Sequence, residues 1–159
     1  TMKYFNVIIY ICLLTLFTGC GFKVLDQTKL KNYKILEITE DGDKKTNFFI
    51  KNELYNLLNV DDSANGLIIS IKTEKVKSIK EKNKKNKITK YNINIVSSIE
   101  LNFIDKNLKK TINSRKQNSY NVNVNHNITQ NNEKNIEKNL IDELSQDISN
   151  QILKIINAF

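Results

Sequence analysis

The sequence is poor in the residues on which enzymes and metal proteins depend. It contains one histidine, four glycines, two cysteines, no proline and no tryptophan. His126 has no second histidine with which to share a metal ion, and it lies in a polar, asparagine-rich stretch typical of a solvated loop. The glycines at 19, 21, 42 and 66 fit neither a phosphate-binding loop nor a G-x-S-x-G turn. We therefore predict no enzyme activity, with no catalytic residue, metal ligand or cofactor.

Long hydrophobic runs are also scarce, and the clearest one ends abruptly. Residues 5–18, FNVIIYICLLTLFT, are almost wholly apolar and follow one basic residue, Lys3. Such a run is too short to cross a bilayer core, which takes about 20 residues. A basic start, a short apolar core and an exit of small residues are typical of a secretory signal. We predict that residues 1–19 are a lipoprotein signal peptide that is removed.

The exit from this run, Phe17-Thr18-Gly19-Cys20, resembles a lipobox, the site at which bacteria acylate a cysteine and cleave before it. The small Thr18 and Gly19 give a peptidase access to the backbone, and a thiol is needed for the thioether to diacylglycerol. The alternative, a cysteine buried at the end of a core helix, fits this context less well. We predict a covalent lipid on Cys20 that attaches the protein to a membrane without crossing it. Cys12 leaves with the signal, so the mature chain has no partner for a disulfide.

Basic charge is concentrated in one stretch of the chain. From Lys72 to Lys90, KTEKVKSIKEKNKKNKITK, nine lysines accompany two glutamates, so this stretch carries +7, while the rest of the mature chain is close to neutral. Localised charge of one sign indicates an anionic partner. The alternative is a solvated hairpin tip in a chain biased toward lysine, since Arg115 is its single arginine. No aromatic residue interrupts the stretch, so we do not expect nucleic acid to stack there.

Hydrophobic periodicity predicts the first half of the fold. Residues 33–40 alternate as a strand does, and a turn follows with Gly42 at its centre. Residues 46–58 have apolar side chains near helical spacing, with Thr46 as the expected cap. The next strand begins near Leu67 and loses its alternation near Thr73, which predicts a bulge there.

Two further strands and a long helix complete the predicted elements. Residues 87–103 alternate clearly between apolar and polar side chains, and a weaker alternation covers residues 108–124. From Glu133 onward we expect a helix, capped by Asn131 or Asn132, with Leu153 off its apolar stripe. The residues of that stripe are Ile136, Leu140, Leu144, Ile148, Ile152 and Ile155.

Together these elements predict an α+β fold. Their order is β-α-β-β-β-α, which gives a four-stranded, mostly antiparallel sheet with two helices packed on one face. In this organisation residues 20–32 form the lipidated N-terminus and a tether, and residues 33–159 form a single domain.

The lipobox running into Gly-Cys-Gly-Phe at residues 19–22, the order of the elements and the C-terminal amphipathic helix resemble the LPS-assembly lipoprotein family. Members of that family are small outer-membrane subunits of the lipopolysaccharide translocon. The resemblance implies a non-enzymatic protein that sits inside a large β-barrel partner, helps that barrel assemble and binds lipopolysaccharide. Because Gly21 stands where a retention signal would place Asp, resemblance to other bacterial lipoproteins implies the outer membrane, on its periplasmic side.

The same resemblance implies an anionic ligand for the basic stretch, namely the phosphates of lipid A or of the core sugars. The candidate lipopolysaccharide-binding residues are Lys77, Lys80, Lys82, Lys84, Lys85, Lys87 and Lys90. A second hypothesis keeps the lipid anchor and the sheet but gives the protein another role. It would be an accessory lipoprotein of a periplasmic transporter complex that never binds lipopolysaccharide.

Overall fold

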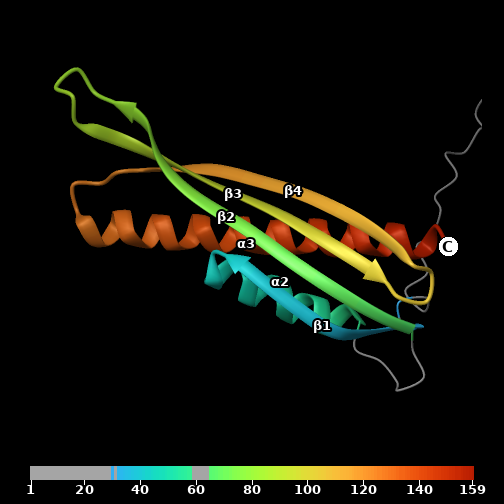
Figure 1. The fold of residues 1–159 in the computed structure, drawn as a ribbon. Helices are drawn as coiled ribbons and strands as arrows, with labels where there is room; N and C mark the ends of the chain where they lie inside the picture. The colour runs from blue at the N-terminus through green and yellow to red at the C-terminus, as the bar shows by residue number, and fades with distance from the viewer. Residues whose placement is uncertain (1–29, 31, 59–64) are drawn as a thin grey trace, which may run out of the picture.

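The computed structural model describes residues 30, 32–58 and 65–159 (Figure 1). The signal peptide and Cys20 predicted from the sequence lie outside these residues. In chain order the elements are β1 (Tyr33–Gly42), α2 (Lys44–Leu58), β2 (Asn65–Lys82), β3 (Ile88–Phe103), β4 (Leu108–Asn121) and α3 (His126–Asn157).

The four strands form one mixed sheet in the order β1-β2-β3-β4. β1 runs parallel to β2, because α2 carries the chain back to the end from which β1 started. β2, β3 and β4 are joined as antiparallel neighbours. Both helices lie on the same face of the sheet (Figure 1). The predicted α+β fold, its order of elements and its two-helix layer are therefore confirmed.

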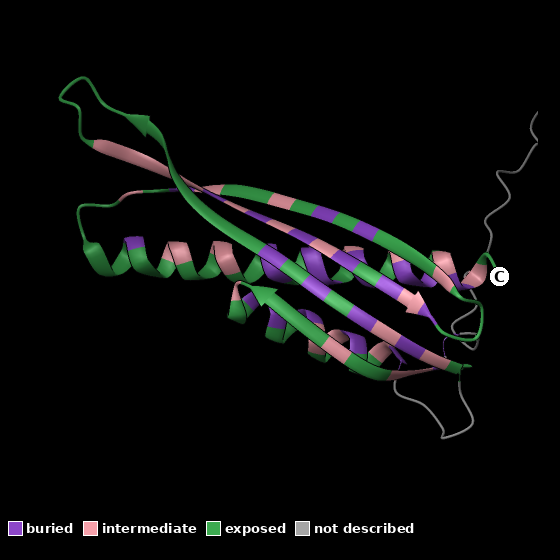
Figure 2. Ribbon diagram, in the orientation of Figure 1, coloured by how far each residue is buried: buried purple, intermediate pink, exposed green. Residues whose placement is uncertain are grey.

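The core lies between the sheet and the helices. Odd-numbered residues of β3 point into it, and Ile95, Ile99 and Phe103 are fully buried there. Register across the sheet continues this inner face into β2, where Ile71 pairs with Ile99, and into β4, where Ile112 pairs with Ile99. Figure 2 shows buried residues alternating along the strands where the helices cover them. The alternation read from residues 87–103 is confirmed.

The predicted bulge at Thr73 is wrong. Thr73 stays in register opposite Ser97, and the register shifts instead near Glu81, close to the end of β2. Thr73 breaks the apolar pattern because it is a buried polar residue on the inner face, 3% exposed. Its hydroxyl donates to Asn47 Oδ1 at 2.7 Å, which provides a partner for both side chains in the core.

The helix starts also differ from the prediction. Thr46 is not the cap of α2, since Asp43 accepts hydrogen bonds from the backbone N–H of Thr46 at 2.9 Å and from its hydroxyl at 2.6 Å. An aspartate at this place also complements the positive end of the helix dipole. α3 starts well before residue 133: its cap is Asn125, whose side chain accepts from the N–H of Asn127. His126 is therefore an exposed residue in the first turn of the helix rather than in a loop.

The apolar face of α3 is wider than a single stripe. Leu140, Leu144, Ile148 and Ile152 are buried as predicted, whereas Ile136 and Ile155 are only partly buried. Leu153, expected to lie off the stripe, is 7% exposed. The broader face exists because α3 packs against α2 as well as against the sheet, so two sides of the helix are covered.

Gly42 is the position at which the β1–α2 connection depends on glycine. Its φ is +92°, and an added Cβ would stand 1.7 Å from the carbonyl oxygen of Thr73.

We predict that Gly42→Ala lowers the free energy of unfolding by about 2 kcal/mol or more, measured by urea denaturation. Gly66→Ala is the control, because its Cβ would meet only the side chains of Leu36 and Ile104, which are both exposed and can move. Equal losses in the two variants would contradict this explanation.

Candidate functional site

The β2–β3 hairpin extends past the rest of the sheet. β2 has 18 residues and β3 has 16, whereas β1 has 10 and β4 has 14. β4 ends at Asn121, which pairs with Lys90, so two strands alone continue beyond that point. Figure 1 shows the tip projecting beyond the first turn of α3, at the opposite end of the domain from the C-terminus.

The tip is closed by an ordered turn. The side chain of Asn83 accepts hydrogen bonds from the backbone N–H groups of Lys85 and Lys87, each at 3.0 Å. The N–H of Asn83 donates to the carbonyl of Lys87 at 2.9 Å, and Asn86 adopts a φ of 60°. Asparagine tolerates this left-handed conformation better than most residues. The turn therefore presents its lysines from a defined backbone.

Four of the predicted lysines lie at this tip: Lys82, Lys84, Lys85 and Lys87. All four are exposed, and within residues 30, 32–58 and 65–159 their side chains make no hydrogen bond or ion pair. Like charges gathered within residues 82–87 repel one another, and their exposed side chains are open to water. An anionic group that approached the tip would relieve that repulsion. These four residues are the part of the predicted site that the structure brings together with open donors.

Lys77 belongs to a different environment at the base of the hairpin. Its ammonium lies 2.7 Å from the carboxylate of Glu133 in α3 and 4.5 Å from the ring centre of Tyr91. Tyr120 donates its hydroxyl to the same carboxylate at 2.7 Å and stacks with Tyr91. We call Lys77, Glu133, Tyr91 and Tyr120 the base cluster. It ties the start of the hairpin to the first turns of α3.

Charge pairing in the base cluster shifts its pKa values. Burial alone would lower the pKa of Lys77, but Glu133 and Tyr120 outweigh burial and hold that pKa above its ordinary value. Burial would likewise raise the pKa of Glu133, but Lys77 and Tyr120 hold it below its ordinary value. Burial is the main reason why the pKa of Tyr120 is raised. Lys77 thus has a structural partner and is not an open donor.

Lys80 and Lys90 lie between the base cluster and the tip. Lys80 donates to the Ser119 hydroxyl at 3.1 Å, and Lys90 pairs with Glu81 at 3.1 Å. Both contacts are exposed, and an exposed ion pair such as Lys90–Glu81 contributes little to stability, about 0–1 kcal/mol. The partner of Lys80 is a neutral hydroxyl, and the partner of Lys90 is an exposed carboxylate, so neither contact holds its ammonium group strongly. Lys80 and Lys90 are therefore weaker candidates for ligand binding than the four tip lysines, because each already has a partner.

The sequence interpretation missed a second charged group on the inner face. Lys75 reaches Glu137 of α3 at 2.8 Å and Asp43 at 2.9 Å, which joins β2 to α3 and to the residue that caps α2. Burial would lower the pKa of Lys75, but the bonds to Glu137 and Asp43 raise it overall. The sequence contains a pattern that indicates this group. Lys75 and Lys77 are odd-numbered residues of β2, like the buried residues before them, and therefore point to the inner face. Glu133 and Glu137, one turn apart on α3, are spaced so that each can pair with one of these lysines.

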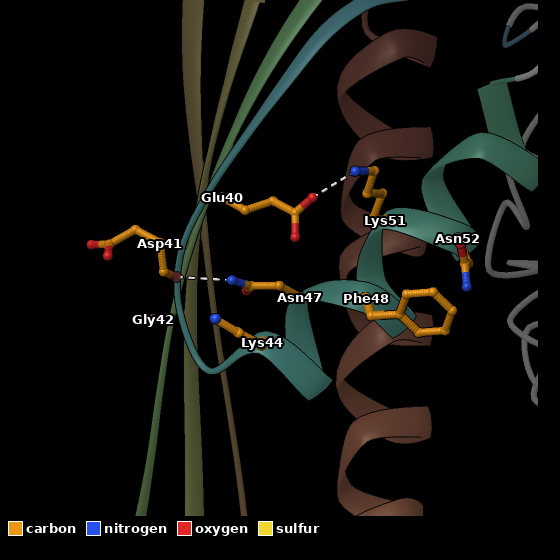
Figure 3. A pocket seen from close by; sticks show the side chains of 8 residues that line it. All are labelled: Glu40, Asp41, Gly42, Lys44, Asn47, Phe48, Lys51 and Asn52. Carbon is orange, nitrogen blue, oxygen red and sulfur yellow. Dashed lines mark hydrogen bonds and ion pairs between the residues drawn. The ribbon is translucent and has the colours of Figure 1, made fainter.

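A pocket of about 630 Å³ lies at the β1–α2 junction (Figure 3). Lys51 crosses it to bind Glu40 at 2.7 Å, and the side-chain amide of Asn47 donates to the backbone carbonyl of Asp41 at 3.0 Å. The hydrogen bond and ion pair with Glu40 raise the pKa of Lys51. The two charged side chains that face each other across this pocket, Lys51 and Glu40, are therefore already paired.

Two further features were sought in the part of the chain that the structure describes. It contains no helix that is both long and apolar enough to cross a membrane. Nor does it contain a cluster of three or more histidine, cysteine, aspartate or glutamate side chains arranged to hold a metal ion.

The base cluster predicts a specific acid sensitivity. Because the pKa of Glu133 is lowered in the folded state, its contribution to stability is complete above its ordinary pKa, near 4.3, and is lost as pH falls through the lowered value. Glu133→Gln should cost about 1 kcal/mol at pH 7 and make the free energy of unfolding fall less steeply between pH 6 and pH 3. Urea titrations across that range test both effects. Glu100→Gln, which removes an exposed pair with Lys109, is the control, and an equal change in its acid profile would contradict the assignment.

No protein-family model matches this chain, and no curated protein sequence matches it. Its fold is nevertheless similar to those of several solved bacterial lipoproteins. Rare lipoprotein B from Shewanella oneidensis aligns with a TM-score of 0.51 and 10% identity, over 77% of this chain and 94% of that one. A minor lipoprotein from Acinetobacter baumannii aligns with a TM-score of 0.50 and 14% identity, over 74% of this chain and 92% of that one. Lipoprotein B from Nitrosomonas europaea aligns with a TM-score of 0.50 and 12% identity, over 81% of this chain and 87% of that one. The chain therefore shares the fold of these lipoproteins.

Proposed function

We propose that the protein is an outer-membrane lipoprotein, acylated on Cys20 and held on the periplasmic side, that binds lipopolysaccharide through the tip of its β2–β3 hairpin. In this role it assists the assembly of a β-barrel partner and the insertion of lipopolysaccharide at the cell surface. The observation that carries the proposal is the tip itself: four lysines without partners among the described residues stand on an ordered turn beyond every other element.

The arrangement of the domain supports this role. The chain enters the sheet at Tyr33, beside Asn65 and at the same end as Phe103. The hairpin tip is at the other end of β2, 18 residues away, or about 60 Å at 3.3 Å per residue. An anchor on Cys20 therefore holds one end of the domain near the membrane, while the other end is free to meet a ligand. The shared fold of the solved lipoproteins is consistent with the lipid anchor.

Phosphate is the ligand chemistry that the tip favours. Lysine ammonium groups bind phosphates as point charges from several directions, without the fixed geometry that arginine requires. Lipid A and the core sugars of lipopolysaccharide present several phosphates close together. Clustered phosphates would match four clustered lysines, and the exposed setting makes the attraction sensitive to salt.

The runner-up, an accessory lipoprotein of a periplasmic transporter complex, makes a different prediction about partners. Purification of the acylated protein in mild detergent separates the two hypotheses. Retention of a β-barrel supports the proposal, whereas retention of an inner-membrane transporter supports the runner-up.

The tip lysines can be tested by a charge-removing variant. Replacing Lys82, Lys84, Lys85 and Lys87 with Gln should weaken binding to lipopolysaccharide vesicles by about tenfold or more at low salt, with no loss of folding. The matched control replaces the same four residues with Arg, which keeps the charge and should keep most of the binding. Unchanged binding by the glutamine variant at low salt would contradict the proposal and would show that these lysines are only solvated side chains.

Acylation is tested at Cys20. Cys20→Ser removes the thiol that forms the thioether, so the variant should accumulate as an uncleaved, unacylated precursor in the membrane fraction. Intact-mass spectrometry measures both changes, and Cys12→Ser serves as the control that should still be processed. A mature lipidated N-terminus in the Cys20→Ser protein would show that the lipobox assignment is wrong.

A further inference from the structure

A groove between the two helices differs from the rest of the surface because its walls are apolar and its rim is basic. Its volume is about 310 Å³. α2 contributes Lys45 and Phe49, and α3 contributes Ile141 between polar neighbours. The remaining lining residues are Lys134, Asn135, Lys138 and Asp142. The groove is far from the hairpin tip in sequence and shares no residue with it.

The helices align so that charge and apolar surface separate along the groove. Lys45 pairs with Glu137 at 3.3 Å, and one turn further along each helix stand Phe49 and Ile141. Phe49 leaves 39% of its surface exposed, while Ile141, which lines the same groove, is buried. The basic end of the groove therefore leads into an aromatic and aliphatic floor. Such a gradient fits a molecule with a charged head and an apolar tail.

Two lysines of the rim, Lys134 and Lys138, have no carboxylate partner among the described residues. Lys134 and Lys138 are four residues apart on α3, both exposed, and neither makes an ion pair within the described ranges 32–58 and 65–159. Like charges at this spacing repel one another, and Glu137, which lies between them in sequence, is already paired with Lys45 and Lys75. An anion bound between them would remove that repulsion. Asp142 stands one turn further along α3, beside the apolar floor, and disfavours a second anion there.

We propose that this groove binds one acyl chain of an anionic lipid, with the phosphate or carboxylate head between Lys134 and Lys138 and the chain along Phe49 and Ile141. The volume lies at the small end of ligand pockets, about 300–1,000 Å³, so it holds one chain rather than a whole glycolipid. The site is independent of the hairpin, and neither proposal requires the other.

The test uses the acylated full-length protein in nanodiscs of a zwitterionic lipid. The probe is dodecyl phosphate that carries a photoreactive group on its chain, and adducts are located by mass spectrometry. We expect adducts on residues 45–49 and 134–142, which unlabelled dodecyl phosphate reduces but dodecyl maltoside and inorganic phosphate do not. Lys134→Gln with Lys138→Gln should reduce labelling by about fivefold or more. Lys110→Gln with Lys116→Gln, an equal loss of charge on β4, should leave it unchanged.

Three results would overturn the groove proposal. They are adducts spread evenly along the chain, equal competition by dodecyl maltoside, and full labelling of the Lys134/Lys138 variant with its thermal unfolding unchanged. The glutamine variant of the four tip lysines separates this proposal from the hairpin site. It should lose lipopolysaccharide binding while it keeps the groove adducts.

Discussion

The constraint on which the rest of the structure depends is that β2 and β3 are longer than the layer that covers them. Where α2 and α3 lie over the sheet, the inner face is apolar, with Leu67, Ile69 and Ile71 of β2 all buried. Each such side chain stabilises the fold by about 1.5–3 kcal/mol, before the entropy of ordering the chain is subtracted. Beyond the start of α3, no helix within the described residues covers the strands. The hairpin must therefore be polar there, and the sequence places lysines where the core ends.

The transition from core to tip is built in steps along the inner face of β2. Thr73 is buried and bonded to Asn47, Lys75 is partly buried and paired with two carboxylates, and Lys77 is bonded to Glu133 beneath two tyrosines. After these come the exposed lysines of the tip. Along β2 the side chains thus change from buried and hydrogen-bonded, to charged and paired, to charged and exposed. No unpaired cation is buried where the hairpin extends beyond the helices. The base cluster is what keeps the projecting part aligned with α3.

Much of the fold could be predicted because its elements follow simple periods. The alternation of Ile93, Ile95 and Ile99 fixes a half-buried strand, and the recurrence of Leu140, Leu144 and Ile148 fixes a helix face. What the periods could not supply was tertiary context. Thr73 looked like a break in the strand because its partner, Asn47, lies on another element. Leu153 looked exposed because nothing in its own helix indicates that α2 packs against that side.

The candidate site was predictable only as a region. The density of lysines along the sequence locates the hairpin. Lys77 and Lys87 cannot be told apart in the sequence, however. Only the folded structure shows that Lys77 is already paired, with Glu133 of α3. The most direct measurement places a photoreactive residue at Glu81, next to the tip lysine Lys82, in the acylated protein of living cells, because the Glu81 side chain makes only an exposed ion pair with Lys90. The account predicts a covalent adduct with lipopolysaccharide that disappears when the same residue is placed at Asn150, in the second half of α3. An adduct with an inner-membrane transporter, or none with lipopolysaccharide, would contradict it.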